Sequence, residues 1–159
     1  MTTVSEHQYF LELSCTLAKQ NVHNEGAPFG AVLVKDGEVL ATGVNRVTAD
    51  CDPTAHAVVN VIREACRMLK TLDLRECVLY TSCEPCPMCL SACYLSRIKH
   101  GYYDATREDA ARIGFNDDSI YREIPLHPEI RSFPLERLQV EDPLSPFQAW
   151  TDFFKTELD

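Results

Sequence analysis

The stretch that decides the fold runs over residues 52–89 and reads DPTAHAVVNVIREACRMLKTLDLRECVLYTSCEPCPMC. Apolar residues recur at helical spacing in its first half, which predicts an amphipathic helix over 55–70 with His56 in the first turn. The apolar run at 77–81 predicts a short buried strand, and a second helix is expected over 87–96 because a proline stands at its first position. A helix, a buried strand and another helix in succession are typical of an α/β protein.

The elements on either side extend this unit into a sheet protein. Two β-rich runs meet at Asp36-Gly37, whose tolerance of positive φ predicts a tight antiparallel hairpin. Periodicity, capping signals and composition predict a helix over 6–20, strands over 29–35, 39–45, 99–104 and 136–140, a helix over 106–113, irregular structure over 115–134, and a helix from about 145 to about 156, while 47–53 is a polar stretch. The expected fold is α/β: a three-layer α/β/α sandwich around a mixed sheet of about five strands, formed by a single domain over 1–159.

Length, charge and cysteine content restrict the class of partner. The 159 residues are enough for one substantial core. A net charge of -9 and a pI near 5.0 oppose binding through phosphate neutralisation, so a small substrate is expected and nucleic acid is disfavoured. The first residues lack the pattern of a signal peptide, and no apolar run reaches membrane-spanning length, so a cytoplasmic protein without membrane contact is expected. The eight cysteines are then thiols and thiolates rather than disulfides.

Three residues of the opening stretch have the chemistry of a zinc site. Cys86 and Cys89 stand three apart at a predicted helix start, so both sulfurs project from one side of the first turn. The positive end of the helix dipole favours their thiolate form, which is the form that binds zinc. His56 is available as a third ligand, and one histidine with two cysteines leaves the fourth tetrahedral position open, as catalytic zinc sites require. The ordinary alternative for His56 is a capping or packed histidine.

The cysteines also allow two other metal sites. The C-x2-C-x2-C-x3-C spacing of bacterial ferredoxins is reproduced by Cys83, Cys86, Cys89 and Cys93. That iron–sulfur interpretation is disfavoured because Tyr94 stands where the ferredoxin run has proline and because no second cysteine run supplies a partner cluster. In the other alternative Cys83 or Cys93 completes a structural zinc site, which predicts a loss of stability on chelation without any turnover.

Longer sequence matches carry a resemblance to a known family. They are DPTAHA at 52–57, YTSCEPCPMC at 80–89, IGFNDDSIY at 113–121 and LSPFQAW at 144–150. With these stretches the chain resembles the zinc-dependent nucleobase deaminases of the cytidine/deoxycytidylate deaminase superfamily, and most of all the bacterial guanine deaminases. The resemblance implies a cytidine deaminase-like fold and hydrolysis of guanine to xanthine and ammonia with one zinc ion per subunit. It also implies a homodimer whose C-terminal helices are exchanged.

The same matching assigns roles around the metal. The substrate-binding residues that it implies are Phe29, Asn45, His56, Ala57 and Asp117. Phe29 would pack on the base, Asn45 would form a hydrogen bond with it, and Asp117 would lie in the pocket. Each of these three also has an ordinary interpretation, as a core aromatic, a strand-ending turn former and a solvated loop residue respectively.

One position departs from the family's pattern. The signature is His-x-Glu, whose glutamate takes a proton from zinc-activated water and passes protons to the substrate, and here the third residue is Val58. A general acid–base group contributes roughly 10²- to 10⁴-fold in rate, so turnover close to zero is expected. Glu64 lies roughly 9 Å further along the helix, and Glu84 lies in the turn before the metal helix, where its side chain is expected to cap or pair. The chain is therefore either an engineered inactive variant or a natural deaminase-like protein that binds a purine or amino-triazine without turnover.

Overall fold

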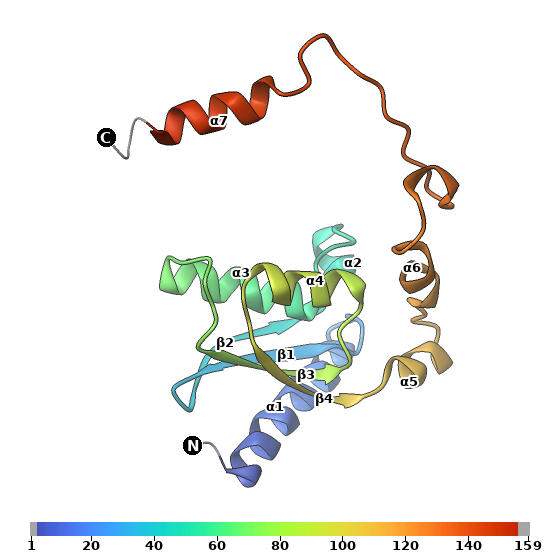
Figure 1. Cartoon of the computed structure of the whole chain (residues 1–159). Helices are drawn as coiled ribbons and strands as arrows, with labels where there is room; N and C mark the ends of the chain where they lie inside the picture. Colours follow the sequence, from blue (N-terminus) through green and yellow to red (C-terminus); the bar gives the residue numbers. More distant parts are fainter. Residues whose placement is uncertain (1–2, 156–159) are drawn as a thin grey trace. The chain divides into compact units, whose positions relative to one another are not determined.

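A computed structural model describes residues 3–155 as alternating strands and helices (Figure 1). In chain order the elements are α1 (Val4–His23), β1 (Gly30–Lys35), β2 (Glu38–Val44), α2 (Val47–Asp50), α3 (Ala57–Leu69), β3 (Cys77–Cys83), α4 (Pro87–Leu95), β4 (His100–Ala105), α5 (Arg107–Arg112), α6 (Asp118–Glu123), the 3-10 helix η1 (Pro128–Ile130) and α7 (Ser145–Lys155). The chain forms two compact units, Met1–Tyr121 and Arg122–Asp159, and the sheet belongs to the first.

The sheet is mixed, as the sequence predicts. Its strand order is β2-β1-β3-β4; β1 is antiparallel to both of its neighbours, whereas β3 and β4 are parallel. Asp36 and Gly37 have φ angles of 52° and 81°, the left-handed conformations that a primed hairpin turn requires. Within residues 3–155 there are four strands rather than about five.

Helices cover both faces of the sheet, which confirms the three-layer α/β/α architecture. In Figure 1, α1 lies against one face, and α3 and α4 lie against the other. Alternate residues of β1 point to opposite faces of the sheet. Val32 and Val34 pack with Phe10 of α1, whereas Ala31 and Leu33 pack in the cluster that includes residues of α3. Because both faces are buried, this strand is a continuous apolar run rather than an alternating one.

The structure corrects several sequence predictions. Residues 136–140 form no strand, because the second unit contains no other strand among its described residues with which they could pair. The stretch 115–134 is not wholly irregular, because it contains α6 and η1, and the polar stretch 47–53 contains the short helix α2. Helices this short leave too little apolar periodicity to be recognised. Helix α3 begins at Ala57, so His56 is its N-cap residue rather than part of its first turn.

The second unit is held together largely by local polar contacts and ends in an amphipathic helix. The Arg131 guanidinium donates hydrogen bonds to the carbonyl oxygens of Leu126 and Ile124, both at 3.0 Å. Helix α7 confirms the predicted terminal helix as far as Lys155, while the predicted end near Thr156 lies outside the described residues. Its exposed aromatic side chains are Phe147, Trp150, Phe153 and Phe154. None of the helices within residues 3–155 is both long enough and apolar enough to cross a membrane.

Candidate active site

Three side chains converge where α3 and α4 begin. The Nδ1 atom of His56 lies 3.5 Å from the Cys86 sulfur and 3.6 Å from the Cys89 sulfur. His56 is the N-cap of α3, Cys86 is the N-cap of α4, and Cys89 lies in the first turn of α4. Pro87 at the first position of α4 suits the start of a helix, because its ring fixes φ and it has no N–H to leave unpaired. The two helix starts thus place all three side chains at one point.

The spacing of these atoms fits one tetrahedral zinc ion. With Zn–N of about 2.0–2.1 Å and Zn–S of about 2.3 Å, tetrahedral angles separate a nitrogen and a sulfur ligand by about 3.6 Å. The two measured separations from His56 Nδ1, 3.5 and 3.6 Å, agree with that value. Across residues 3–155 these three residues form the one group of three or more potential ligands, with all ligand atoms within 4.8 Å of one another. They are positioned to bind one metal ion and leave its fourth position open.

The cysteines around the site differ in charge state. Hydrogen bonds from the Cys89 thiol, from His56 and from the Cys89 backbone N–H lower the pKa of Cys86 to about 4. The pKa of Cys89 is raised because its thiol hydrogen-bonds to the Cys86 thiolate and is buried, so without metal the pair holds one negative charge. Burial raises the pKa of Cys83 and of Cys93 to about 11. Neither Cys83 nor Cys93 belongs to the group whose ligand atoms lie within 4.8 Å of one another, which favours the three-ligand arrangement over the four-ligand alternatives.

The loop before α3 is shaped by side-chain hydrogen bonds that orient His56. The Asp52 carboxylate accepts from the Thr54 N–H at 2.8 Å and from its hydroxyl at 2.7 Å. Asn60 on α3 donates to the carbonyl of Ala55 at 3.1 Å and to the last carbonyl of β2 at 2.9 Å. These contacts tie the loop both to its own helix and to the sheet, so the metal-binding histidine is held from two sides.

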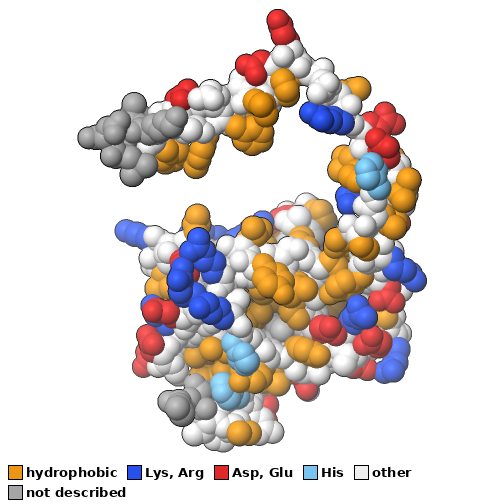
Figure 2. All heavy atoms as spheres, in the orientation of Figure 1, with side chains coloured by type: hydrophobic (Ala, Val, Ile, Leu, Met, Phe, Trp, Pro, Cys, Tyr) orange, Lys and Arg blue, Asp and Glu red, His pale blue; other side chains and the backbone are white. Residues whose placement is uncertain are grey.

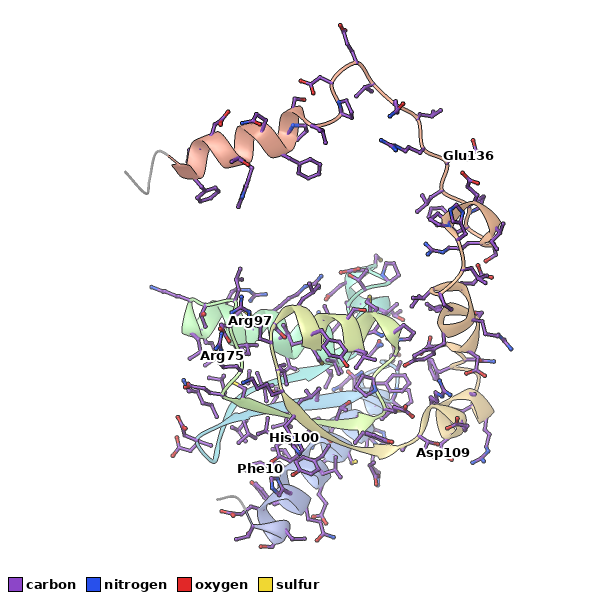
Figure 3. The ribbon with its side chains drawn as sticks, viewed as in Figure 1. Phe10, Arg75, Arg97, His100, Asp109 and Glu136 are labelled. Carbon is purple, nitrogen blue, oxygen red and sulfur yellow. The ribbon has the colours of Figure 1, made fainter. Side chains whose placement is uncertain are left out.

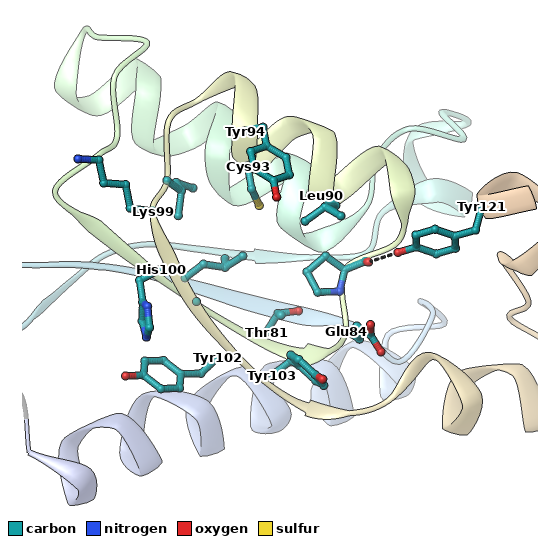
Figure 4. Close-up of a pocket in the computed structure, with 14 residues that line it drawn as sticks. Thr81, Glu84, Leu90, Cys93, Tyr94, Lys99, His100, Tyr102, Tyr103 and Tyr121 are labelled. Carbon is teal, nitrogen blue, oxygen red and sulfur yellow. Dashed lines mark hydrogen bonds between the residues drawn. The ribbon is translucent and has the colours of Figure 1, made fainter. Parts of the chain in front are cut away.

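The turn that carries Cys86 is supported by neighbouring groups that are not metal ligands. The Tyr121 hydroxyl donates to the Pro85 carbonyl at 3.2 Å (Figure 4). The Arg107 guanidinium lies over the Tyr121 ring, 4.9 Å from its centroid. The N–H of Glu84 donates to the end of β4, at Ala105 O, at 2.9 Å. A second cavity of about 320 Å³ is lined by residues of α4 and β4 and by Glu84 and Pro85 of this turn. The metal turn is thus fixed by groups that do not reach the metal.

A cavity of about 410 Å³ lies in front of the metal ligands and gathers every site residue that the sequence predicts. Its lining includes the three metal ligands as well as Phe29, Asn45, Ala57, Val58 and Asp117. It also includes Arg107 and Phe115, which the sequence reasoning missed. A lone aromatic residue or arginine in a stretch without periodicity gives no local signal that it lines a cavity, so only the fold identifies Phe115 and Arg107.

The cavity presents apolar and polar groups to a ligand. The Phe29 ring meets the Phe115 ring edge-on, with centroids 4.9 Å apart and an interplanar angle of 84°. The Asn45 side-chain oxygen accepts from the Val47 N–H at 3.2 Å, so the Asn45 NH₂ group is its remaining donor. Burial raises the pKa of the Asp117 carboxyl, and the nearby Cys86 charge raises it further. A planar base with both acceptor and donor atoms on its edge would suit this lining.

Val58 is buried and apolar at the position that the family signature gives to glutamate. Its exposed fraction is 3%; it lines the cavity and packs in the core beneath α3. The Glu84 carboxylate also lines the cavity, but it accepts a hydrogen bond from the Arg107 N–H at 3.2 Å. Glu64 is paired with Arg67 at 2.8 Å and is not among the residues that line the cavity.

Comparisons with known proteins agree with this geometry. The sequence model described as the cytidine and deoxycytidylate deaminase zinc-binding region matches residues 4–105. The chain is 51% identical over 148 residues to the guanine deaminase of Bacillus subtilis (strain 168), covering 92% of this chain and 95% of that protein. The X-ray structure of guanine deaminase from Bacillus subtilis has a TM-score of 0.90 to this fold at 50% identity, covering 92% and 94% of the two chains.

More distant relatives share part of the chain. The tRNA-specific adenosine deaminase of Aquifex aeolicus (strain VF5) is 43% identical over 98 residues, covering 62% of this chain and 65% of that protein. A mutant protein solved in complex with 8-azaguanine has a TM-score of 0.67 at 30% identity, covering 70% of this chain and 64% of its own.

Proposed function

This chain belongs to the cytidine and deoxycytidylate deaminase family, in its guanine deaminase group, and we propose that its cavity binds guanine beside one zinc ion. The corresponding reaction is hydrolysis of guanine to xanthine and ammonia. We propose that the present chain carries out this reaction at a rate close to zero. The observation that supports both statements is that the metal ligands, the proposed base-binding side chains and Val58 line one cavity.

Each side chain of the cavity has a distinct proposed role. Zinc bound by the three ligands would act as a Lewis acid that acidifies a water molecule next to the base. Phe29 would cover a face of the base, since aromatic faces stack favourably on planar rings. Asn45 would donate its NH₂ group to an acceptor on the base edge, because its oxygen already accepts from Val47. The Asp117 carboxylate would accept from an N–H group of the base.

Val58 is the reason for the proposed loss of activity. Two thiolate ligands would neutralise the charge of a bound Zn²⁺, so it would acidify water less than a three-histidine site does, and a separate proton acceptor would be needed. Valine has no group that can accept or deliver a proton. The Oε2 atom of Glu84 accepts from the Arg107 N–H, which ties this carboxylate to the start of α5, and Glu64 does not line the cavity, so we propose that neither replaces the missing glutamate.

A small base suits the chain better than a nucleic acid. The net charge of -9 opposes binding to a polyanion, whose affinity depends on Lys and Arg contacts to phosphates. The match to the guanine deaminase covers 92% of this chain, whereas the match to the tRNA-specific adenosine deaminase covers 62%. A mutant protein of related fold was solved in complex with 8-azaguanine, a close analogue of guanine.

The proposed assembly is a homodimer in which the α7 helices are exchanged, so that all of 1–159 serves one kind of site. Helix α7 exposes Phe147, Trp150 and Phe153, an apolar surface that an isolated helix in water would not maintain. Figure 2 shows further hydrophobic side chains gathered over α4 and beside β4, where Tyr94 and Leu95 are exposed. None of the eight cysteines forms a disulfide, which supports the proposal of a reducing compartment such as the cytoplasm.

The test of this function is restoration of the missing carboxylate. Val58→Glu is expected to raise xanthine release from guanine by at least about 100-fold, since it returns a general acid–base group to the cavity. Val58→Gln is the matched control, because it has nearly the same shape and cannot accept a proton at neutral pH. The parent chain and both variants should each contain about one zinc ion per chain.

Two outcomes would contradict the proposal. A Val58→Glu chain that is fully loaded with zinc and still releases no xanthine would show that the cavity is not a guanine deaminase site. A broad visible absorption band with iron in place of zinc would support the iron–sulfur alternative instead.

A further inference from the structure

We infer that Asn21, at the end of α1, is a positioning residue that sets the geometry of the base-binding half of the cavity. Its side chain touches none of the metal ligands and does not line the cavity. It acts through the backbone of Asn45, so the inference rests on the proposed function. The site residues named from the sequence do not include it.

The Asn21 side chain joins two chain segments that carry cavity residues. Its Nδ2 group donates to the Ala27 carbonyl at 2.9 Å and to the Asn45 carbonyl at 2.8 Å. The same segments are also connected through Phe29, whose N–H donates to Ala27 O at 2.8 Å and whose carbonyl accepts from the Asn45 N–H at 3.0 Å. One amide group therefore closes a ring of hydrogen bonds around the residues proposed to stack on the base and to bind its edge.

The position of this amide is determined from several sides. Asn21 is 8% exposed, and its own carbonyl accepts from the N–H groups of Asn24 at 3.0 Å and Gly26 at 2.8 Å. A Cβ atom added at Gly26 would lie 2.2 Å from the Asn21 Nδ2 atom. Glycine is therefore required beside the amide, which indicates that the chain is built closely around this side chain.

Asn21 influences ligand binding by fixing the backbone of Asn45. Its backbone carbonyl is held by Asn21, and its side-chain oxygen is held by the Val47 N–H at 3.2 Å. The NH₂ group of Asn45 makes no hydrogen bond within residues 3–155, so it is the part of this residue left for a ligand in the cavity. A hydrogen-bond donor must be placed to within about 0.5 Å to be effective, and releasing the backbone of Asn45 removes that accuracy.

Neither aspartate nor serine reproduces both contacts. An aspartate at this position has no hydrogen to donate when ionised, and a serine has one. Asn21→Asp therefore removes the amide donor from the carbonyls of Ala27 and Asn45 while keeping the size of the side chain, and only the Ala27 carbonyl retains another donor, the Phe29 N–H. The metal ligands are held by other groups, so zinc binding and base binding should respond differently.

The experiment measures binding of 8-azaguanine to the zinc-loaded full chain by calorimetry, together with zinc content. In Asn21→Asp, 8-azaguanine should bind at least about tenfold more weakly, while zinc stays at the parent stoichiometry, because small misplacements of a binding group cost large factors in affinity and rate. Gly26→Ala displaces the same amide without changing it and should give the same pattern. In the Val58→Glu background, Asn21→Asp should raise KM for guanine by a similar factor.

Ser96→Ala is the matched control. The buried Ser96 hydroxyl also contacts two carbonyls, those of Ala92 at 2.8 Å and Cys93 at 3.2 Å, but Ser96 does not line the cavity. It should lower stability and leave 8-azaguanine binding unchanged. The inference is overturned if the parent chain binds 8-azaguanine and Asn21→Asp or Gly26→Ala binds it within twofold of the parent. Failure of the zinc-loaded parent to bind 8-azaguanine would overturn the proposed function, and this inference with it.

Discussion

Replacing Gly43 by alanine tests how closely the sheet approaches the helix that carries the metal ligand. Gly43 lies on β2, and a Cβ atom added there would be 2.5 Å from the Ala57 carbonyl oxygen and 2.8 Å from the Val61 nitrogen. These are backbone atoms of α3 rather than the ends of flexible side chains. To reach the 3.4 Å of an ordinary contact, the helix must withdraw by about 0.6–0.9 Å.

That displacement predicts two measurable effects. Overpacking costs roughly 1–3 kcal/mol, and the smaller conformational freedom of an unfolded alanine chain offsets roughly 0.4–1 kcal/mol, so a net destabilisation of about 1–2 kcal/mol is expected. Ala57 directly follows His56, so withdrawing the helix also moves the metal-binding nitrogen. Because a shift of this size exceeds the roughly 0.5 Å tolerance of a ligand constellation, zinc should bind at least about tenfold more weakly.

The assay is urea unfolding with and without zinc, combined with competition for zinc against a chelator. Gly101→Ala on β4 is the matched control, since its added Cβ would meet the Leu79 carbonyl at 3.2 Å and the Leu79 side chain at 3.3 Å. The free energy of unfolding of the control should stay within about 1 kcal/mol of the parent value, and the control should bind zinc as tightly as the parent. If Gly43→Ala were as stable as the parent and bound zinc equally well, the close contact between β2 and α3 would not hold His56 in place.

Three further results are expected. His56→Ala should reduce zinc content well below one per chain, measured by metal analysis, because two thiolates alone leave the ion without its third protein ligand. Asp117→Asn should weaken 8-azaguanine binding by roughly tenfold in calorimetry while zinc content is unchanged, since a charged acceptor is replaced by a neutral one; equal affinity would remove Asp117 from the base site. Stability should fall as pH rises from about 10 to about 12, because burial raises the pKa of Tyr80 from 10.0 to about 12 and the unfolded tyrosine ionises first; unfolding curves of Tyr80→Phe should show a weaker decline over this range.

Much of the fold follows from local patterns. The hairpin could be predicted because only a few residue pairs tolerate the positive φ that Asp36 and Gly37 adopt. The capping box at Thr106 and Asp109 could be predicted because both hydrogen bonds join residues three apart. The apolar face of α3 could be predicted from its periodicity, although the first helical residue differs from the expected one.

The incorrect predictions have a common cause. The alternating residues at 136–140 resemble a strand, but a strand exists only where a neighbour supplies hydrogen bonds, and sequence periodicity does not identify that neighbour. Asn21 gives no signal because an asparagine near a helix end is common for local reasons, whereas its two partners lie on other segments. Phe115 gives none because an aromatic residue in a non-periodic stretch can be core, surface or pocket.

The sequence by itself determined the chemistry of this protein: a histidine and two cysteines at zinc-ligand spacing, and a valine in place of the expected proton carrier at residue 58. The tertiary structure decided which atoms meet: His56 Nδ1 lies at tetrahedral distance from both sulfurs, and Asn21 holds the carbonyl of Asn45. The physical reason is the sequence separation of the interacting residues. Turns, caps and ligand spacings depend on residues a few positions apart, whereas a cavity depends on backbone contacts between distant segments, and their register is set by the packing of the whole core.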